Sequence, residues 1–318
     1  MSMLDRQMQA FVAQSLSHDP ENATHATALQ QRQYYKAKCL EIAQPMPVGI
    51  EVKDTHIKSS DGYLVPVRHY SHNLPTNTAA TKIVFFHGGG FVVGDLDSHH
   101  DICGHIAKDT GLDLVAVDYR LAPEYQYPDD INDCLTVVDY FLNQAERIVL
   151  VGDSAGGTLS ASVAYARRQF VDVGNGPSII GQVLIYPALT CGTDTPSMIE
   201  HANAPLLSKA DMDYYFSIRV GGEAKQIPTD DNLYTPMQRA DYKGLPATHL
   251  FPAQIDPLRD DCALYEQSLK QAQVKVTNHI ELGEGLVHGY LRARAISDKA
   301  AHNFKAICTA IKELGEAN

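Results

Sequence analysis

A serine set between glycines has the local sequence that most favours chemistry in this chain. Ser154 lies in Gly152–Gly156, which fits the pattern G-x-S-x-G. The apolar run Ile148–Val151 before it predicts a strand buried on both faces, and the Ala-rich stretch Thr158–Phe170 after it predicts a helix. Because a strand, a sharp turn and a helix hold a serine hydroxyl clear of a sheet, Ser154 is a candidate nucleophile. The alternative is a glycine-rich turn with a solvated serine.

A serine hydroxyl needs a base to remove its proton and a carboxylate to orient that base. Asp256 follows an apolar run that ends at Phe251, so it is expected at the end of a strand. Of the 14 histidines, His288 is the one in a glycine-flanked loop after the last expected strand. We therefore expect His288 to act as the base and Asp256 as the carboxylate. Asp261, further along, is expected to support a helix N-terminus or to meet solvent.

Backbone amides that bind a developing oxyanion are the second requirement of such chemistry. The expected strand Lys82–Phe86 runs directly into His87 and three glycines. A run of glycines allows the backbone to approach a ligand closely, although a merely flexible loop is the alternative. The amides of Gly88 and Gly89, together with that of Ala155 at the start of the helix, are the candidate donors. His87 is expected to orient this loop.

The elements that must position these residues alternate along the chain. Ile50–Tyr70 has the pattern of a hairpin, with a turn at 60–62. The strands and helices expected after it occupy Lys82–Phe86, Leu112–Asp118, Asp130–Ala145, Arg147–Val151, Ala155–Phe170, Gln182–Ile185, Ala247–Phe251, Pro257–Ala272, Val274–Glu281 and Ile296–Leu314. This alternation predicts an α/β fold, in which a mostly parallel sheet is covered by helices on both faces.

Two segments do not follow this alternation, and we interpret both as parts of a helical cap. Residues 1–48 are expected to be helical, in stretches up to Ala43, with Leu4, Met8, Phe11 and Val12 on one apolar face. Residues 190–236 are too long for a simple connection and contain one convincing helix, near Ser208–Val220. The two cap segments would thus alternate with two parts of the core, 49–189 and 237–318.

Composition narrows the classes of partner. Lys and Arg number 26 and Asp and Glu 38, so the net charge is −12, which disfavours nucleic acid and anionic membranes and favours neutral or cationic small molecules. The six cysteines are scattered and predict reduced thiols rather than disulfides or a zinc site. No secretory signal or membrane-spanning run is apparent, so we expect a cytoplasmic protein.

Five motifs occur in the order and near the spacing found in one family. The motifs are HGGGF (His87–Phe91), YRLAPE (Tyr119–Glu124), GDSAGG (Gly152–Gly157), DPLRD (Asp256–Asp260) and HG (His288–Gly289). With them the chain, from about Ile50 to its end, resembles the hormone-sensitive-lipase-like carboxylesterases, or bacterial family IV, of the α/β-hydrolase fold. The N-terminal helices match that family only in kind. Thr158, Phe91 and Tyr290 depart from residues common there.

The resemblance implies a serine carboxylesterase without a cofactor. It gives Ser154 the role of nucleophile, His288 that of base and then acid, and Asp256 that of orienting carboxylate, with Gly88, Gly89 and Ala155 as the oxyanion hole. It implies small ester substrates with short to medium acyl chains, and a homodimer is compatible with it. An amide or peptide hydrolase, a deacetylase and a non-catalytic ligand receptor remain as alternatives.

Three further groups of residues could have a role in binding or only a structural one. His99, His100 and Asp101 resemble a metal cluster, but side chains of adjacent residues at the start of a helix diverge, so a metal is not expected. The run Tyr214–Phe216 could line an acyl pocket or simply pack. Arg120 and Glu124 are expected to hold a turn near the top of the sheet.

Overall fold

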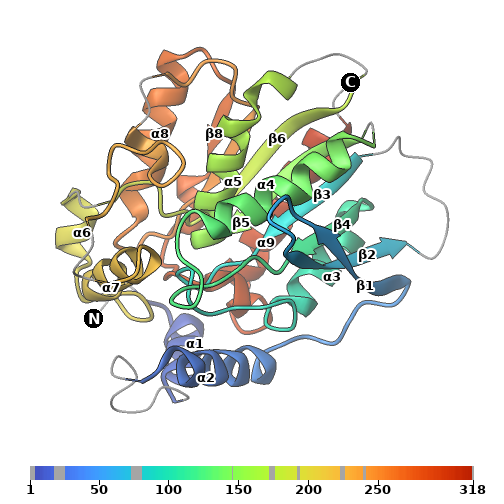
Figure 1. Cartoon of the computed structure of the whole chain (residues 1–318). Coiled ribbons are helices and arrows are strands. Elements are labelled where there is room, and N and C mark those ends of the chain that lie inside the picture. The colour runs from blue at the N-terminus through green and yellow to red at the C-terminus, as the bar shows by residue number, and fades with distance from the viewer. Residues whose placement is uncertain are drawn as a thin grey trace.

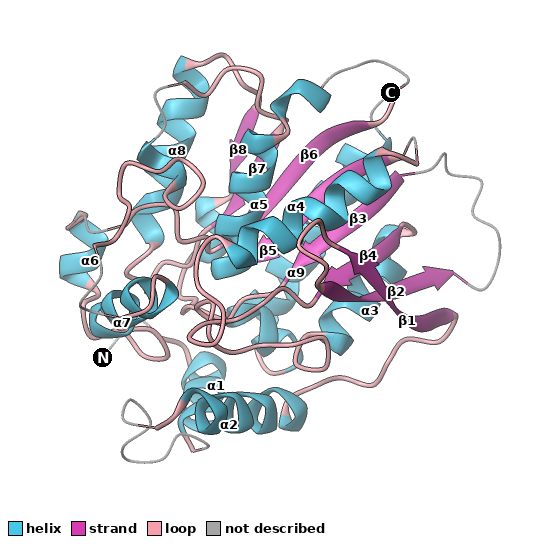
Figure 2. Ribbon diagram, viewed as in Figure 1, coloured by secondary structure: helices cyan, strands magenta, loops and turns pink. Residues whose placement is uncertain are grey.

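One sheet organises the residues described by this computed structural model, which are 4–17, 26–72, 81–144, 146–171, 176–191, 194–222, 226–238 and 241–316. These residues form eight strands in the order β1-β2-β4-β3-β5-β6-β7-β8 (Figure 2). The strands are β1 (Ile50–Lys58), β2 (Leu64–His72), β3 (Thr81–Phe86), β4 (Asp113–Val117), β5 (Arg147–Asp153), β6 (Ser178–Ile185), β7 (Thr248–Phe251) and β8 (Val276–Asn278). The expected hairpin is β1 and β2, which pair antiparallel, and the strands from β4 to β8 pair in parallel. The expected α/β fold is confirmed.

Helices cover both faces of this sheet. On one face lie α3 (His100–Thr110) and α9 (Asp298–Glu316), and on the other lie α4 (Asp129–Leu142), α5 (Ala155–Ala166) and α8 (Arg259–Gln271) (Figure 1). The central strand β3 shows why both faces need cover. Its Ile83 and Phe85 pack in the core beneath α3 and α9, whereas Val84 and Phe86 pack in the core beneath α4, α5 and α8. Successive side chains of a strand point to opposite faces, so an all-apolar strand requires two covered faces.

The structure differs from the expected elements mainly at their ends. The last strand is shorter than the expected Val274–Glu281, because β8 pairs only with β7 and the chain turns into a 3₁₀ helix at Ile280–Gly283. The turn brings Gly283 against the backbone of Pro252, where a Cβ atom would lie 2.4 Å from the Pro252 carbonyl oxygen. The predicted helix up to Phe170 ends at Ala166, and a 3₁₀ helix, Arg168–Phe170, follows it.

Both predicted cap segments contain helices. The first holds α1 (Arg6–Leu16) and α2 (Ala28–Glu41), and the second holds α7 (Lys209–Arg219) and a short helix that we did not expect, α6 (Pro196–Glu200). Met8 and Phe11 are buried against the core of the α3 and α9 face, as the apolar face of α1 predicts. Figure 1 shows α1 and α2, in blue, close to α7, in gold, and the side chain of Gln31 in α2 donates a hydrogen bond to the Tyr214 hydroxyl in α7, at 3.2 Å.

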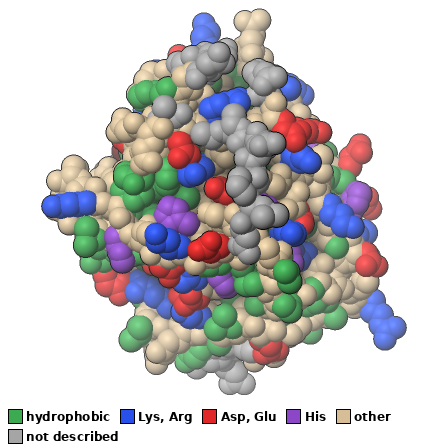
Figure 3. All heavy atoms as spheres, turned by 90° about the vertical axis from the view of Figure 1, so that its right-hand side faces the viewer, with side chains coloured by type: hydrophobic (Ala, Val, Ile, Leu, Met, Phe, Trp, Pro, Cys, Tyr) green, Lys and Arg blue, Asp and Glu red, His purple; other side chains and the backbone are tan. Residues whose placement is uncertain are grey.

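The charged surface, the cysteines and the helix lengths can be compared with what the composition predicts. Acidic and basic side chains are interspersed on the described part of the face in Figure 3, which is the right-hand side of Figure 1. All six cysteines are buried free thiols. None of the described helices has the length and hydropathy of a transmembrane span.

Candidate active site

Ser154 occupies a strained turn between β5 and α5. Its φ of 55° and ψ of −119° are unusual for a residue with a side chain, and its amide donates to the Ile185 carbonyl oxygen, at 2.8 Å. The flanking glycines make this turn sterically feasible. A Cβ atom on Gly152 would lie 2.2 Å from the Gly156 carbonyl oxygen, and one on Gly156 would lie 1.9 Å from that of Phe86. The turn therefore fixes the serine hydroxyl at the carboxyl end of the sheet.

The loops that carry Asp256 and His288 are held in register by their own backbones. Beyond β7 and β8 the chain forms one further parallel bridge, between Ile255 and Val287, and the Ile255 amide donates to the Leu286 carbonyl oxygen at 3.0 Å. Asp256 and His288 are the next residues on the two sides of this bridge. The sheet thus brings side chains that are 32 residues apart in sequence to neighbouring positions.

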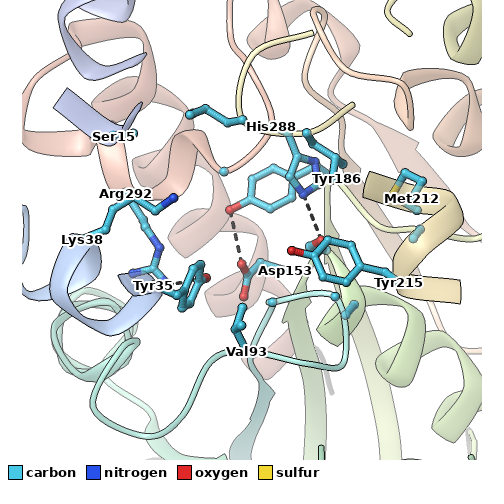
Figure 4. A pocket seen from close by; sticks show the side chains of 18 of the residues that line it. Ser15, Tyr35, Lys38, Val93, Asp153, Tyr186, Met212, Tyr215, His288 and Arg292 are labelled. Atoms are coloured by element: carbon cyan, nitrogen blue, oxygen red, sulfur yellow. Dashed lines mark hydrogen bonds between the residues drawn. The ribbon is translucent and has the colours of Figure 1, made fainter. Parts of the chain in front are cut away.

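The three predicted catalytic side chains form one chain of hydrogen bonds. His288 Nε2 lies 2.9 Å from Ser154 Oγ, and His288 Nδ1 lies 2.7 Å from Asp256 Oδ2. Figure 4 draws the first of these bonds, from His288 to the serine. Asp256 is fully buried and His288 is 8% exposed. Because a carboxylate only accepts hydrogen bonds, Nδ1 carries the imidazole proton and Nε2 is left to accept from the serine hydroxyl. This arrangement can remove a proton from Ser154.

The glycine loop corrects one prediction. The Gly88 amide donates to Asp153 Oδ1, at 2.9 Å, so it is already engaged and the prediction that it binds an oxyanion is wrong. Gly89 and Gly90, with φ of 129° and 60°, line the cavity beside Ser154 and Ala155, and Gly88 is not among the described residues that do. Gly90 therefore lines the cavity where Gly88 was expected to. The expectation that the Gly89 amide binds an oxyanion stays a prediction.

His87 contacts the glycine loop that we expected it to orient, with its Nδ1 2.9 Å from the Gly88 carbonyl oxygen. Its ring stacks on that of Tyr119 at 4.4 Å between centroids, and the Tyr119 hydroxyl donates to the His87 carbonyl oxygen at 2.6 Å. Burial, and then the neighbouring His99, lower the pKa of His87 to about 4. The imidazole is therefore neutral at pH 7.

A buried polar cluster around Asp153 lies beside the serine, and the sequence did not predict it. Asp153 accepts hydrogen bonds from the Gly88 amide and from Tyr186, at 3.4 Å, and lies 3.3 Å from His99 Nε2. Burial alone would raise the pKa of Asp153, but His99, Arg292 and the Gly88 amide outweigh it and lower this pKa to about 2. Asp153 therefore holds the glycine loop as a carboxylate. Because Asp153 directly precedes Ser154, the sequence could have indicated that it lies in the site. No comparable feature of the sequence distinguished Arg292.

The histidines weighed as metal ligands have separate roles. His99 contacts Asp153 and Arg292, whereas His100 Nδ1 lies 3.0 Å from the Tyr70 hydroxyl. Asp101 forms an ion pair with Arg294. The three side chains point to different partners, as expected at the start of a helix.

Two further carboxylates differ from expectation in their partners. Asp261 is fully buried and does not meet solvent. Its carboxylate instead accepts hydrogen bonds from the Leu189 and Thr190 amides, at 2.7 and 2.9 Å. Glu124 does more than hold a turn, since it pairs with Arg32 of α2, at 2.6 Å, and so links the cap to the core.

A cavity lies over Ser154 and is open to solvent, with room for the centres of water-sized spheres in about 110 Å³. Its walls come from the core, from α1 and α2, and from α7, so both cap segments bound the site. Tyr215 and Phe216 of α7 line it, as one interpretation of the aromatic run predicted. Apolar side chains supply most of the wall around the Ser154 and His288 pair.

Comparison with known proteins identifies the class. A family model of the alpha/beta hydrolase fold matches residues 83–292, and the chain belongs to this family. The esterase LipI of Mycobacterium tuberculosis is 34% identical to it over an alignment of 255 positions, which covers 78% of this chain and 77% of LipI. The carboxylesterase NlhH of the same organism is 36% identical over an alignment of 253 positions, which covers 74% of each chain.

A solved structure extends the match to the cap. The esterase of Pyrobaculum calidifontis superimposes with a TM-score of 0.82 at 26% identity, covering 99% of this chain and 100% of that one. The resemblance to hormone-sensitive-lipase-like enzymes is thereby confirmed, and the chain is a serine carboxylesterase of that group.

Proposed function

We propose that Ser154, His288 and Asp256 carry out ester hydrolysis through an acyl-enzyme. His288 Nε2 takes the hydroxyl proton as Ser154 Oγ bonds to the ester carbonyl carbon, and it returns that proton to the leaving alcohol. Water then gives a proton to His288 Nε2 as its oxygen bonds to the acyl carbon, and His288 passes that proton to Ser154 Oγ as the acyl bond breaks, which releases the acid and restores the serine hydroxyl. The 2.9 Å separation of His288 Nε2 and Ser154 Oγ is the observation that supports this proposal most strongly.

We propose the amides of Gly89, Gly90 and Ala155 as the oxyanion hole. These three residues line the cavity next to Ser154, and Ala155 opens a helix, whose N-terminus favours negative charge. The Gly88 amide serves Asp153 instead and so holds the loop.

We further propose that the preferred acyl chains are short to medium. The cap contributes side chains of α1, α2 and α7 to the wall of the cavity, among them Phe11, Met212 and Phe216, and these bulky apolar groups narrow the space for a long chain. A series of p-nitrophenyl acetate, butyrate, octanoate and palmitate tests this, and highest kcat/KM on palmitate would refute it.

Replacement of the serine tests the mechanism itself. In Ser154→Ala the kcat for p-nitrophenyl butyrate should fall by about 10⁶-fold, as when a triad acts as a unit. Near wild-type turnover would overturn the assignment. The same triad could cleave amides or remove acetyl groups, and a panel of matched esters and anilides separates these reactions. A receptor would bind without turnover, which the intact hydrogen-bonded triad argues against.

A cytoplasmic location and a homodimer stay as predictions. Sedimentation of the purified protein at several concentrations tests the dimer. Fractionation of the source cells tests the location.

A further inference from the structure

The core holds the first part of the glycine loop. Asp153 accepts a hydrogen bond from the Gly88 amide at 2.9 Å, and the Val93 amide donates to the Gly89 carbonyl oxygen at 2.9 Å. The first bond fixes the start of the loop, and the second closes a turn after it. Gly90 lies within this turn, with a φ of 60°, and lines the catalytic cavity.

A tyrosine of the cap packs directly on Gly90. Figure 4 shows Tyr215 extending from α7 into the cavity that contains His288. A Cβ atom on Gly90 would lie 2.4, 2.5 and 2.6 Å from Cδ1, Cγ and Cε1 of Tyr215, whereas carbon atoms in contact are about 3.5–4.0 Å apart. One side of the ring therefore occupies the space that a side chain at position 90 would need, and it packs against the backbone of the loop.

The two residues after Gly90 also contact the cap. The Arg219 guanidinium of α7 lies 3.9 Å from the centroid of the Phe91 ring, and Arg32 Nε of α2 donates to the Val92 carbonyl oxygen at 2.8 Å. Both cap segments thus touch the backbone or side chains that continue the glycine loop. The ring on Gly90 differs from these contacts because it is made at one of the proposed oxyanion donors.

We propose that Tyr215 is a positioning residue, through which α7 holds the Gly90 amide in the direction of the oxyanion. An oxyanion hole stabilises the transition state only where its donors are held at hydrogen-bond distance, so a small displacement of Gly90 weakens the transition state more than the binding of the ester. The cap then contributes to the chemical step as well as to the wall of the cavity. This inference rests on the proposed esterase mechanism and its oxyanion hole, and deepens both.

A pair of ketone inhibitors separates these two effects in the full-length enzyme. With 1,1,1-trifluoro-2-octanone, Ser154 Oγ bonds to the ketone carbon, the hydroxyl proton passes to His288 Nε2, and the carbonyl oxygen becomes an oxyanion. 2-Octanone has the same chain but an unactivated carbonyl group, so it measures binding without the adduct. The measured quantity is the inhibition constant of 2-octanone divided by that of the trifluoro ketone. Neither constant depends on the fraction of active enzyme.

Replacement of the ring should weaken binding of the oxyanion and little else. Tyr215→Leu should lower the ratio, and the kcat for p-nitrophenyl butyrate, by about 10-fold, with KM changed by less than about 3-fold. The loss is smaller than for removal of a donor, because the Gly90 amide is displaced and still present. Tyr215→Phe should leave the ratio unchanged, since it retains the ring that touches Gly90.

The neighbouring tyrosine supplies a matched control on the same helix. Tyr214 lines an outer groove between α2 and α7, and it is not among the described residues that line the catalytic cavity. Its hydroxyl accepts the hydrogen bond from Gln31. Tyr214→Leu should therefore leave the ratio of inhibition constants unchanged.

The failures are distinguishable. If Tyr215→Leu leaves the ratio unchanged, or raises KM and both inhibition constants equally, the positioning role is refuted and the esterase mechanism stands. An equal fall of the ratio in Tyr214→Leu would also refute it, because the effect would not come from the contact with Gly90. If wild-type enzyme binds the two ketones equally, Ser154 forms no adduct, and the proposed mechanism fails together with the positioning role.

Discussion

The catalytic rim and the cap are held in place by different kinds of contact. At the rim, the turn at Ser154 and the bridge between Ile255 and Val287 are backbone features, fixed by glycines and by the sheet. In the cap, side chains of α7 and α2 pair with distant residues of the core, and Arg219 and Arg32 are two of these attachments. The positions of the catalytic side chains therefore depend on the backbone beside each of them, whereas the shape of the cavity depends on contacts between distant segments.

The two cap attachments also differ from each other. Arg219 is 1% exposed, pairs with Asp130 at 2.6 Å, and lies over the ring of Phe91 at 3.9 Å. The ion pair between Arg32 and Glu124 is partly open to solvent, with side chains 27% and 51% exposed. The α7 attachment should therefore resist disruption more strongly than the α2 attachment.

The largest expected effect is at the rim. Asp256→Asn keeps the shape of the side chain but removes the charge that orients and stabilises the protonated His288. The kcat for p-nitrophenyl butyrate should fall by about 10⁴-fold. The urea midpoint should move little by comparison. A variant with more than a tenth of the wild-type kcat would show that Asp256 does not orient the base.

The buried cap attachment comes next. Arg219→Met leaves Asp130 buried without its partner, and the free energy of unfolding should fall by about 3–5 kcal/mol in urea titrations. Because α7 lines the cavity, KM should rise as well. Glu124→Gln is the matched change at the exposed attachment and should alter stability by less than about 1 kcal/mol. Equal losses in the two variants would remove the distinction between the attachments.

The oxyanion loop supplies a third test. A Cβ atom on Gly89, where φ is 129°, would lie 2.1 Å from the Val93 carbonyl oxygen, so Gly89→Ala must displace the loop. Loss of oxyanion contacts should lower kcat by roughly 10²–10³-fold. The control is Gly62→Ala, at φ 91° in open space, which should leave kcat unchanged. A Gly89→Ala enzyme with wild-type kcat would exclude the proposed donors.

The smallest effect concerns pH. The folded protein holds His87 neutral, with a pKa of about 4 against an ordinary 6.5, so the unfolded chain binds more protons between these values. His87 therefore lowers the free energy of unfolding as pH falls from 6.5 towards 4, by up to about 3 kcal/mol. His87→Phe keeps a ring on Tyr119 and should flatten this part of the profile. His99 and Asp118 also face the ring, so the measured quantity is the difference in the free energy of unfolding between wild type and His87→Phe at each pH. If this free energy changes with pH equally in the two proteins, His87 does not contribute to the pH dependence.

Local motifs explain why the rim was predictable from the sequence. The order of Ser154, Asp256 and His288, each after an expected strand, was sufficient to predict their meeting, because the carboxyl ends of parallel strands share one edge. The error at Gly88 arose because the partner of its amide, Asp153, lies 65 residues away and belongs to the serine motif itself. Which of three consecutive glycines faces the cavity depends on that hydrogen bond, and periodicity contains no information about it.

The cap was predictable only in outline. The apolar face of α1 and the helix near Ser208–Val220 followed from their spacing, but the partners of Arg219 and Arg32 did not. Both side chains pair with residues from a different part of the chain, and a charged residue on a helix is most often on a solvated face. Long-range pairing of this kind has no local signature.

Labelling with a fluorophosphonate tests whether Ser154 is a nucleophile activated by His288. This reagent forms a covalent bond with a serine whose hydroxyl is activated by a base in the same site. We expect the peptide containing Ser154 to gain the mass of the label in the wild-type enzyme, and Ser154→Ala and His288→Ala to gain none in the same time. A wild-type enzyme that stays unlabelled, or carries the label on another serine, would contradict this expectation.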